Sequence, residues 1–216
     1  MAIQEAGLAT EVRGVISAGK EADVYLGGYN GAPLAIKVYR LYRTSHRGGS
    51  PIKLESAGRL AAHEFDMLLQ AWKGGAPVPA PARRVENMLT MRYLGDERPA
   101  PRLQDVRLER PERCLNELLS GIGALAGAGV VHSDLSAFNV LMYHDRPWFI
   151  DLSEAIRVDR TGYSPWQRLE AAEAALVHGL RALGAYFRRY DLEVDAQGEA
   201  DRLVRRLDRW GVLDMD

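Results

Sequence analysis

Short apolar runs separated by tight turns open the chain. Residues 12–17, 22–28 and 33–40 each gather β-branched and aromatic side chains, and glycine or asparagine stands between the runs. This pattern is typical of successive antiparallel strands. Two further runs, at residues 82–87 and 88–95, have the same character. The pattern therefore predicts a five-stranded antiparallel sheet in the first half of the chain.

Helical periodicity dominates outside this predicted sheet. Apolar residues at helical spacing predict a helix at residues 55–72, and a segment rich in glycine and proline ends it. The same periodicity predicts helices at residues 113–128, 166–190 and 199–210. A sheet with one helix, followed by a mainly helical part, is an α+β arrangement.

A small hairpin is predicted at residues 140–150, with a polar turn at residues 144–146. Asn139 stands immediately before the hairpin and Asp151 immediately after it. Because a two-stranded ribbon returns the chain close to its start, we expect these two side chains to lie side by side. Asp134 should lie nearby, free to accept a proton.

The chemistry of these residues indicates a hard cation. Carboxylate and amide oxygens without a cluster of histidine or cysteine favour Mg²⁺ or Mn²⁺ over Zn²⁺. His132, two residues before Asp134, has two possible roles. We interpret it as a loop histidine that hydrogen-bonds the backbone, in preference to a group that transfers protons.

Length and charge narrow the class of protein. A chain of 216 residues, 47% of them apolar, can bury a substantial core as one domain or two small lobes. The 28 basic residues nearly balance the 29 acidic ones, so no net charge attracts a nucleic acid or a membrane surface, and no direct nucleic-acid motif is present. A secretory signal and a long apolar segment are also absent from the sequence. We expect a cytoplasmic protein whose single cysteine, Cys114, packs in the core.

The turn between the first two predicted strands holds Ser17, Gly19 and Lys20. Backbone N–H groups at a glycine can approach a phosphate that a larger side chain would block. A glycine-containing hairpin that binds nothing has the same sequence, and the turn matches neither a G-x-G-x-x-G nor a P-loop pattern. The turn alone therefore does not establish a phosphate site.

Lys37 lies between apolar residues of the third predicted strand. It must point to solvent or face a partner, because an unpaired buried ammonium is too costly. Glu64, on the predicted helix at residues 55–72, could reach back to pair with Lys37. The alternative is that Lys37 and Glu64 are both solvated.

These segments occur in the order of the protein-kinase fold, and in detail they resemble the RIO family of atypical protein kinases. The sequences SAGKEADVY, VHSDLSAFNVL and FIDLSEAI are similar to the family's phosphate, catalytic and metal-binding loops. The resemblance implies one bilobal kinase domain over residues 1–216, with an N-lobe at about 10–92 and a reduced helical C-lobe at about 95–216. It also implies the branch without an N-terminal winged helix and the absence of an activation segment.

Three features depart from common kinase or family patterns. Ala137 stands where the family's catalytic loop usually has an acidic residue, and Ser153 replaces the glycine of the D-F-G motif. The loop at residues 41–57 is shorter than in many members. Substrate handling is therefore expected to differ.

The resemblance also implies roles for the residues that match. The phosphate loop and Lys37 would contact the phosphates of ATP, with Glu64 fixing Lys37. Met91, Arg92 and Leu94 would line the adenine pocket.

Further roles fall on the catalytic and metal-binding loops. Asp134 would orient or deprotonate the attacking hydroxyl, while Asn139 and Asp151 would hold Mg²⁺. In RIO proteins the aspartate at the position of Asp151 can also receive the phosphoryl group.

The implied function is that of an ATP-dependent serine/threonine protein kinase, with autophosphorylation, slow ATP hydrolysis through an aspartyl phosphate, or both. The alternatives are a small-molecule kinase of the aminoglycoside or choline type and a nucleotide-binding scaffold without turnover. The sequence does not name the protein substrate, although the family suggests a ribosome-related assembly. The loop at residues 43–53 offers hydroxyl acceptors for autophosphorylation at Thr44, Ser45 and Ser50.

Overall fold

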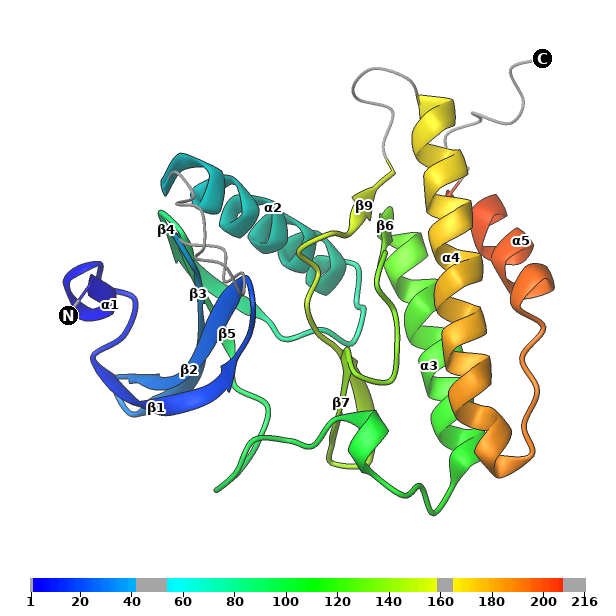
Figure 1. Cartoon of the computed structure of the whole chain (residues 1–216), viewed down its shortest axis with the longest axis horizontal. Helices are drawn as coiled ribbons and strands as arrows, with labels where there is room; N and C mark the ends of the chain where they lie inside the picture. Colours follow the sequence, from blue (N-terminus) through cyan, green and yellow to red (C-terminus); the bar gives the residue numbers. More distant parts are fainter. Residues whose placement is uncertain (1, 42–53, 159–164, 208–216) are drawn as a thin grey trace, which may run out of the picture. The chain divides into compact units, whose positions relative to one another are not determined.

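The computed structural model describes residues 2–41, 54–158 and 165–207, which fall into two compact units (Figure 1). The first unit comprises Met1–Leu69 and Pro79–Pro99, and the second comprises Gln70–Val78 and Ala100–Asp216. The predicted loop at 43–53, with the candidate acceptors Thr44, Ser45 and Ser50, lies outside the described residues.

A five-stranded antiparallel sheet forms the first unit, as predicted. Its strands lie in the order β1-β2-β3-β5-β4. They are β1 (Glu11–Ala18), β2 (Ala22–Tyr29), β3 (Ala32–Tyr39), β4 (Pro81–Val85) and β5 (Met88–Arg92). The run predicted to extend to residue 95 therefore ends three residues early.

The turn from β2 to β3 shows how local sequence sets this register. Asn30 and Gly31 have φ angles of 49° and 87°, the left-handed pair that a two-residue turn of type I′ requires. Asparagine and glycine tolerate this conformation at low cost. The turn aligns Val24 with Lys37 across the two strands.

Helix α2 (Leu54–Lys73) confirms the helix predicted at residues 55–72. Its part within the first unit buries Ala57, Ala61, Glu64 and Leu68, which recur every three or four residues. This spacing places them on one face of the helix. Glu64 bonds side chains of β3, so this face packs against the sheet.

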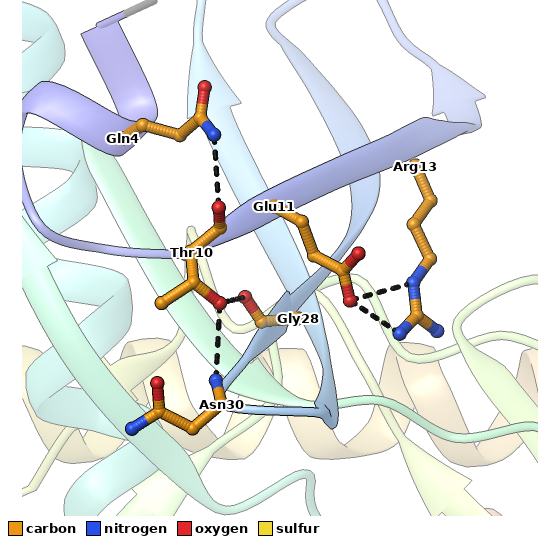
Figure 2. Close-up of polar contacts among 6 residues, drawn as sticks. All are labelled: Gln4, Thr10, Glu11, Arg13, Gly28 and Asn30. Atoms are coloured by element: carbon orange, nitrogen blue, oxygen red, sulfur yellow. Dashed lines mark hydrogen bonds and ion pairs between the residues drawn. The ribbon is translucent and has the colours of Figure 1, made fainter.

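The sequence pattern did not predict the structure of the N-terminal segment. It forms the single helical turn α1 (Ala2–Glu5) and then a strap that buries Leu8. Figure 2 shows how Thr10 fastens the strap. The Thr10 hydroxyl donates to the carbonyl oxygen of Gly28 at 3.1 Å and accepts from the backbone N–H of Asn30 at 3.1 Å. The side-chain amide of Gln4 donates to the Thr10 carbonyl oxygen at 3.0 Å.

Helices make up most of the second unit, and α5 packs against both α3 and α4 (Figure 1). They are α3 (Pro111–Gly127), α4 (Pro165–Phe187) and α5 (Ala196–Leu207), with the 3₁₀ turns η1 (Leu103–Asp105) and η2 (Arg188–Tyr190). Cys114 is buried in α3 as expected, and burial raises the pKa of its thiol to about 12.

Two of the predicted helix boundaries were wrong. The helix predicted to end at residue 190 ends at Phe187, because the chain tightens into η2 and turns at Asp191 with a φ of 57°. The helix predicted from residue 199 begins three residues earlier. Asp195 caps it by accepting the backbone N–H of Gly198 at 3.0 Å.

The second unit also contains two small ribbons, β6 (Val130–Val131) with β9 (Ile156–Arg157) and β7 (Val140–Tyr143) with β8 (Arg146–Phe149). The β7–β8 hairpin was predicted, but its turn is shorter than expected. His144 and Asp145 alone form the turn, both with positive φ, and Arg146 already belongs to β8. Across the described part of the chain, no helix is both long enough and apolar enough to cross a membrane.

Candidate active site

The predicted site residues are distributed over the two units, and the first unit holds a buried ion pair. Lys37 Nζ lies 2.8 Å from Glu64 Oε1, and only 10% of the lysine side chain and 1% of the glutamate side chain are exposed. Neither residue is a solvated surface charge. Burial of both charges is tolerable because each neutralises the other at hydrogen-bond distance.

Tyr39 contacts both Lys37 and Glu64. The sequence analysis did not predict these contacts. Its hydroxyl donates to Glu64 Oε2 at 2.6 Å, and Lys37 Nζ lies 5.1 Å from the centre of its ring. Tyr39 follows Lys37 by two positions on β3, so the two side chains share one face of the strand. That spacing was the available signal, but a tyrosine in an apolar strand also suits simple core packing.

The predicted phosphate-binding turn lies between β1 and β2. Gly19 donates its N–H to the carbonyl oxygen of Ala22 at 2.9 Å, and a Cβ at Gly19 would lie only 2.8 Å from that oxygen. A side chain at this position would force the turn open. Lys20 is exposed and Ser17 is half-buried.

An ion pair that the sequence did not reveal braces this turn. Arg40 donates to both carboxylate oxygens of Asp23, at 3.0 and 2.6 Å, and its backbone N–H donates to the Glu21 carbonyl oxygen at 2.7 Å. Hydrogen bonding to Asp23 raises the pKa of Arg40. The end of β3 therefore fixes the start of β2, directly after the turn.

The residues predicted to line an adenine pocket have different environments. Met91 and Leu94 are buried, whereas the Arg92 side chain is exposed. Gly95 follows with a φ of 152°, and a Cβ there would lie 2.6 Å from the Tyr93 hydroxyl oxygen. The backbone N–H of Arg92 donates to the Ala80 carbonyl oxygen at 2.8 Å. The role of these residues around adenine stays a prediction.

Asp134 and Asn139 are joined directly in the second unit. The Asn139 side-chain amide donates to the Asp134 carbonyl oxygen at 2.7 Å and to Asp134 Oδ2 at 2.9 Å. This closes the loop that precedes β7. Because the amide nitrogen is held by Asp134, the Asn139 carbonyl oxygen Oδ1 points away from Asp134.

The placement of Asn139 beside Asp151 stays a prediction, and the backbone is consistent with it. The Ile150 N–H donates to the Asn139 carbonyl oxygen at 3.0 Å, so the backbone does bring Asn139 next to the residue before Asp151. The Asn139 side chain, however, bonds Asp134, and Ser153 Oγ donates to Asp151 Oδ1 at 2.7 Å. The bond from Asn139 to Asp134 was not predicted, although Asp134 was expected to lie nearby.

The donor set still suits a hard cation. Asp151 is exposed, its φ of 63° lies in the left-handed region, and it contributes carboxylate oxygens. Asn139 could offer Oδ1. Within residues 2–41, 54–158 and 165–207, no group of three or more His, Cys, Asp or Glu side chains could hold a metal ion. Carboxylate and amide oxygens are ligands that a magnesium-type ion prefers, so the residues present fit such an ion.

His132 and Ser133 connect the loop that contains Asp134 to the segment that contains Asp151. His132 Nε2 donates to the Ile150 carbonyl oxygen at 2.9 Å, and Ser133 Oγ donates to the Glu154 carbonyl oxygen at 2.7 Å. His132 is buried, and desolvation lowers its pKa. It is therefore a neutral histidine that bonds the backbone, as interpreted from the sequence.

Comparison with known proteins identifies the family of this chain. A family model described as the RIO domain matches residues 23–196. The chain belongs to the RIO family. The resemblance inferred from the three loop sequences is thereby confirmed.

Named relatives of this RIO domain are protein kinases. It is 32% identical over 200 residues to the RIO-type serine/threonine-protein kinase Rio1 of Haloferax volcanii, with 84% of this chain and 65% of the relative covered. It is 30% identical over 175 residues to the serine/threonine-protein kinase RIO1 of Homo sapiens, with 71% of this chain and 30% of the relative covered. The chain thus spans just under two thirds of the first relative and under a third of the second.

Solved RIO structures share the fold. The crystal structure of the Rio2 kinase-ADP/Mg²⁺-phosphoaspartate complex from Chaetomium thermophilum matches with a TM-score of 0.71 at 22% identity. The match covers 97% of this RIO domain and 69% of that chain. The expected kinase-like α+β fold is confirmed.

Proposed function

We propose that this RIO domain is an ATP-dependent phosphotransferase that acts as a serine/threonine protein kinase, as a slow ATPase, or as both. The observation that carries the proposal is the buried Lys37–Glu64 pair, 2.8 Å between Nζ and Oε1. A buried ammonium held by one carboxylate is suited to bind phosphate oxygens, as in protein kinases. The kinase names of the relatives support the same class.

Residues of the first unit would bind the nucleotide. Lys37 would contact the α and β phosphates, and Glu64 would hold Lys37 in place. The turn with Ser17, Gly19 and Lys20 would cover the phosphates through its backbone N–H groups. Met91 and Leu94 would provide apolar contacts to adenine, and Arg92 would contribute backbone groups.

Residues of the second unit would carry out the transfer. Asn139 Oδ1 and Asp151 would hold Mg²⁺ or Mn²⁺, which when bound offsets negative charge on the phosphates. Asp134, positioned by its hydrogen bond from Asn139, would orient the acceptor hydroxyl and accept its proton.

Asp151 would also act as a phosphoryl acceptor. One of its carboxylate oxygens would bond to the γ-phosphorus of ATP while the bond from that phosphorus to the bridging oxygen breaks, so that ADP leaves. Water would then hydrolyse the aspartyl phosphate. The hydrogen bond from Ser153 to Oδ1 would help to orient the carboxylate. The phosphoaspartate of the Chaetomium thermophilum complex supports this step by analogy.

The two compact units would be the N-lobe and C-lobe of a single kinase domain, with ATP as its ligand. A protein substrate and a ribosome-related assembly as partner rest on the family resemblance, and a cytoplasmic location rests on the single cysteine and the apolar pattern of the sequence. Membership in the RIO family favours this class over a kinase of aminoglycosides or choline.

The test is transfer of label from γ-labelled ATP with Mg²⁺ by the purified chain. Wild type should label itself or release phosphate, and Lys37→Met and Asp151→Ala should each lose that activity. Asp145→Ala, at the exposed tip of the β7–β8 hairpin, is the matched control and should keep it. Unchanged turnover in Asp151→Ala would exclude the assigned site.

A further inference from the structure

A connected set of buried hydrogen bonds surrounds the Lys37–Glu64 pair. The structure describes five buried polar or charged side chains, and three of them, Lys37, Glu64 and Asn87, belong to this set. Tyr39 lies at its centre and joins all three. Buried polar groups that are mutually satisfied specify one arrangement, because any other arrangement would leave a polar group without a partner.

Tyr39 is held firmly on its own strand. Its backbone N–H donates to the Asn87 carbonyl oxygen at 2.9 Å, and the Asn87 side-chain amide donates to the Tyr39 carbonyl oxygen at 2.6 Å. The tyrosine itself is only 1% exposed. The two bonds hold the Tyr39 backbone, and burial confines its ring.

Both oxygens of the Glu64 carboxylate accept a hydrogen bond. Lys37 donates a hydrogen bond to Oε1 at 2.8 Å, and Tyr39 donates one to Oε2 at 2.6 Å. A carboxylate with one partner can rotate about its terminal bond, whereas separate donors on both oxygens restrict that rotation. The short distance to Oε2 is that of a charge-assisted hydrogen bond, which is stronger than a neutral one.

We propose that Tyr39 is a positioning residue for the phosphate-binding lysine. Its hydroxyl fixes Glu64, and Glu64 in turn fixes Lys37 before a nucleotide binds. The inference rests on the proposed function and adds a residue to it. It assigns Tyr39 a role beyond filling the core, since packing alone would be served equally well by phenylalanine.

The first experiment uses Tyr39→Phe, which keeps the ring and removes only the hydroxyl. We expect the Kd for Mg²⁺–ADP and Mg²⁺–ATP, measured by calorimetry, to rise about fivefold to tenfold, because a buried carboxylate oxygen loses its donor. The KM for ATP should rise with it, while kcat changes less. Tyr29→Phe is the matched control, since Tyr29 is 42% exposed at the end of β2, and its Kd should stay at the wild-type value.

A double-mutant cycle separates positioning from packing. If Tyr39 acts through Glu64, the effect of Tyr39→Phe on Kd should vanish in a Glu64→Ala background. If Glu64→Ala does not fold, Glu64→Gln replaces it, and the effect should fall to about half on a logarithmic scale because the acceptor is neutral. Thermal unfolding of each variant without nucleotide verifies that it is folded.

The outcomes are distinct. An unchanged Kd in Tyr39→Phe, or an equal loss in both backgrounds, would overturn the role of Tyr39 while leaving the proposed function intact. A wild-type chain that binds neither Mg²⁺–ADP nor Mg²⁺–ATP would instead overturn the proposed function itself.

Discussion

His132 Nε2 donates to the backbone carbonyl oxygen of Ile150 at 2.9 Å, and this bond joins the loop that carries Asp134 to the residue before Asp151. The carbonyl can only accept, so Nε2 carries the proton. The same two stretches are also joined by the pairing of β6 with β9 and by Ser133. The buried histidine is therefore one of three links between the stretches that carry the two aspartates.

This histidine should make stability depend on pH. Its folded pKa lies below the unfolded value of 6.5, so below that pH the unfolded chain binds more protons than the folded chain. The contribution of neutral His132 to the free energy of unfolding is complete above pH 6.5. It is lost as pH falls toward the folded pKa, and the loss at pH 5 is at most about 2 kcal/mol. Urea unfolding at pH 7 and pH 5 should therefore show that the free energy of unfolding falls more in wild type than in His132→Gln. Equal losses in the two proteins would contradict the assignment.

The brace between Arg40 and Asp23 should influence nucleotide binding from outside the binding turn. Arg40→Ala removes both hydrogen bonds to Asp23, and we expect the KM for ATP to rise about threefold to tenfold because the turn loses its fixed position. Arg40→Lys should lie between wild type and Arg40→Ala, because an ammonium cannot reproduce the bidentate geometry. Steady-state kinetics over a range of ATP concentrations measure the change.

A surface ion pair on β1 provides the control for that experiment. Arg13 and Glu11 are paired, but their side chains are 45% and 47% exposed. Exposed pairs of this kind contribute little. Arg13→Ala should therefore leave the KM for ATP unchanged, and an equal rise in both variants would indicate a general charge effect rather than a brace.

Close packing between α3 and the hairpin gives a prediction about stability. A Cβ at Gly121 would lie 2.7 Å from Phe149 Cε2 and 2.9 Å from Pro77 Cγ. Gly121→Ala should destabilise the fold by about 1–3 kcal/mol, because neighbouring side chains must move. Chemical denaturation is the measurement.

Gly127 on the same helix is the matched control. A Cβ there would meet no atom within 4 Å, and its φ is not in the left-handed region. Gly127→Ala should be neutral or stabilise by up to about 1 kcal/mol through helix propensity. If Gly121→Ala were as well tolerated as Gly127→Ala, the close contact would not constrain α3.

Local patterns predicted most of the fold. The five strands and α2 were predicted correctly because their signals, apolar alternation, the Asn30–Gly31 turn and helical periodicity, act over a few residues. The two-residue strands β6 and β9 were missed because two residues carry no periodicity. The N-terminal strap was missed because Leu8 is buried by contacts that its neighbours in sequence do not reveal.

The site was predicted less completely than the fold. The cost of a buried charge left pairing and solvation of Lys37 and Glu64 both open, and the family resemblance favoured pairing. Tyr39 resembled an ordinary core residue. The bond between Arg40 and Asp23 depends on the pairing of β2 with β3, which sequence spacing does not supply. The bond from the Asn139 side chain to Asp134 was not predicted, because it depends on the conformation of the loop that holds both residues.

The last prediction concerns the chemical form of phosphate on the protein. If Asp151 accepts the γ-phosphoryl group, the product is an acyl phosphate, which hydroxylamine cleaves, whereas phosphoserine and phosphothreonine resist it. After incubation with γ-labelled ATP and Mg²⁺, part of the bound label should be lost in neutral hydroxylamine, and this part should be absent from Asp151→Ala. Ser153→Ala should keep the labile label but change its lifetime, because Asp151 Oδ1 loses its hydrogen bond.

The control for this experiment is the label that survives hydroxylamine. It reports transfer to hydroxyl groups, and Asp134→Ala should reduce it more than the labile fraction, because a carboxylate acceptor has no proton to remove. If all label resisted hydroxylamine and persisted in Asp151→Ala, transfer to hydroxyl groups would be the whole chemistry. Slow phosphate release by wild type would then have to proceed by direct attack of water on ATP, with Asp151 serving only as a ligand for the metal ion.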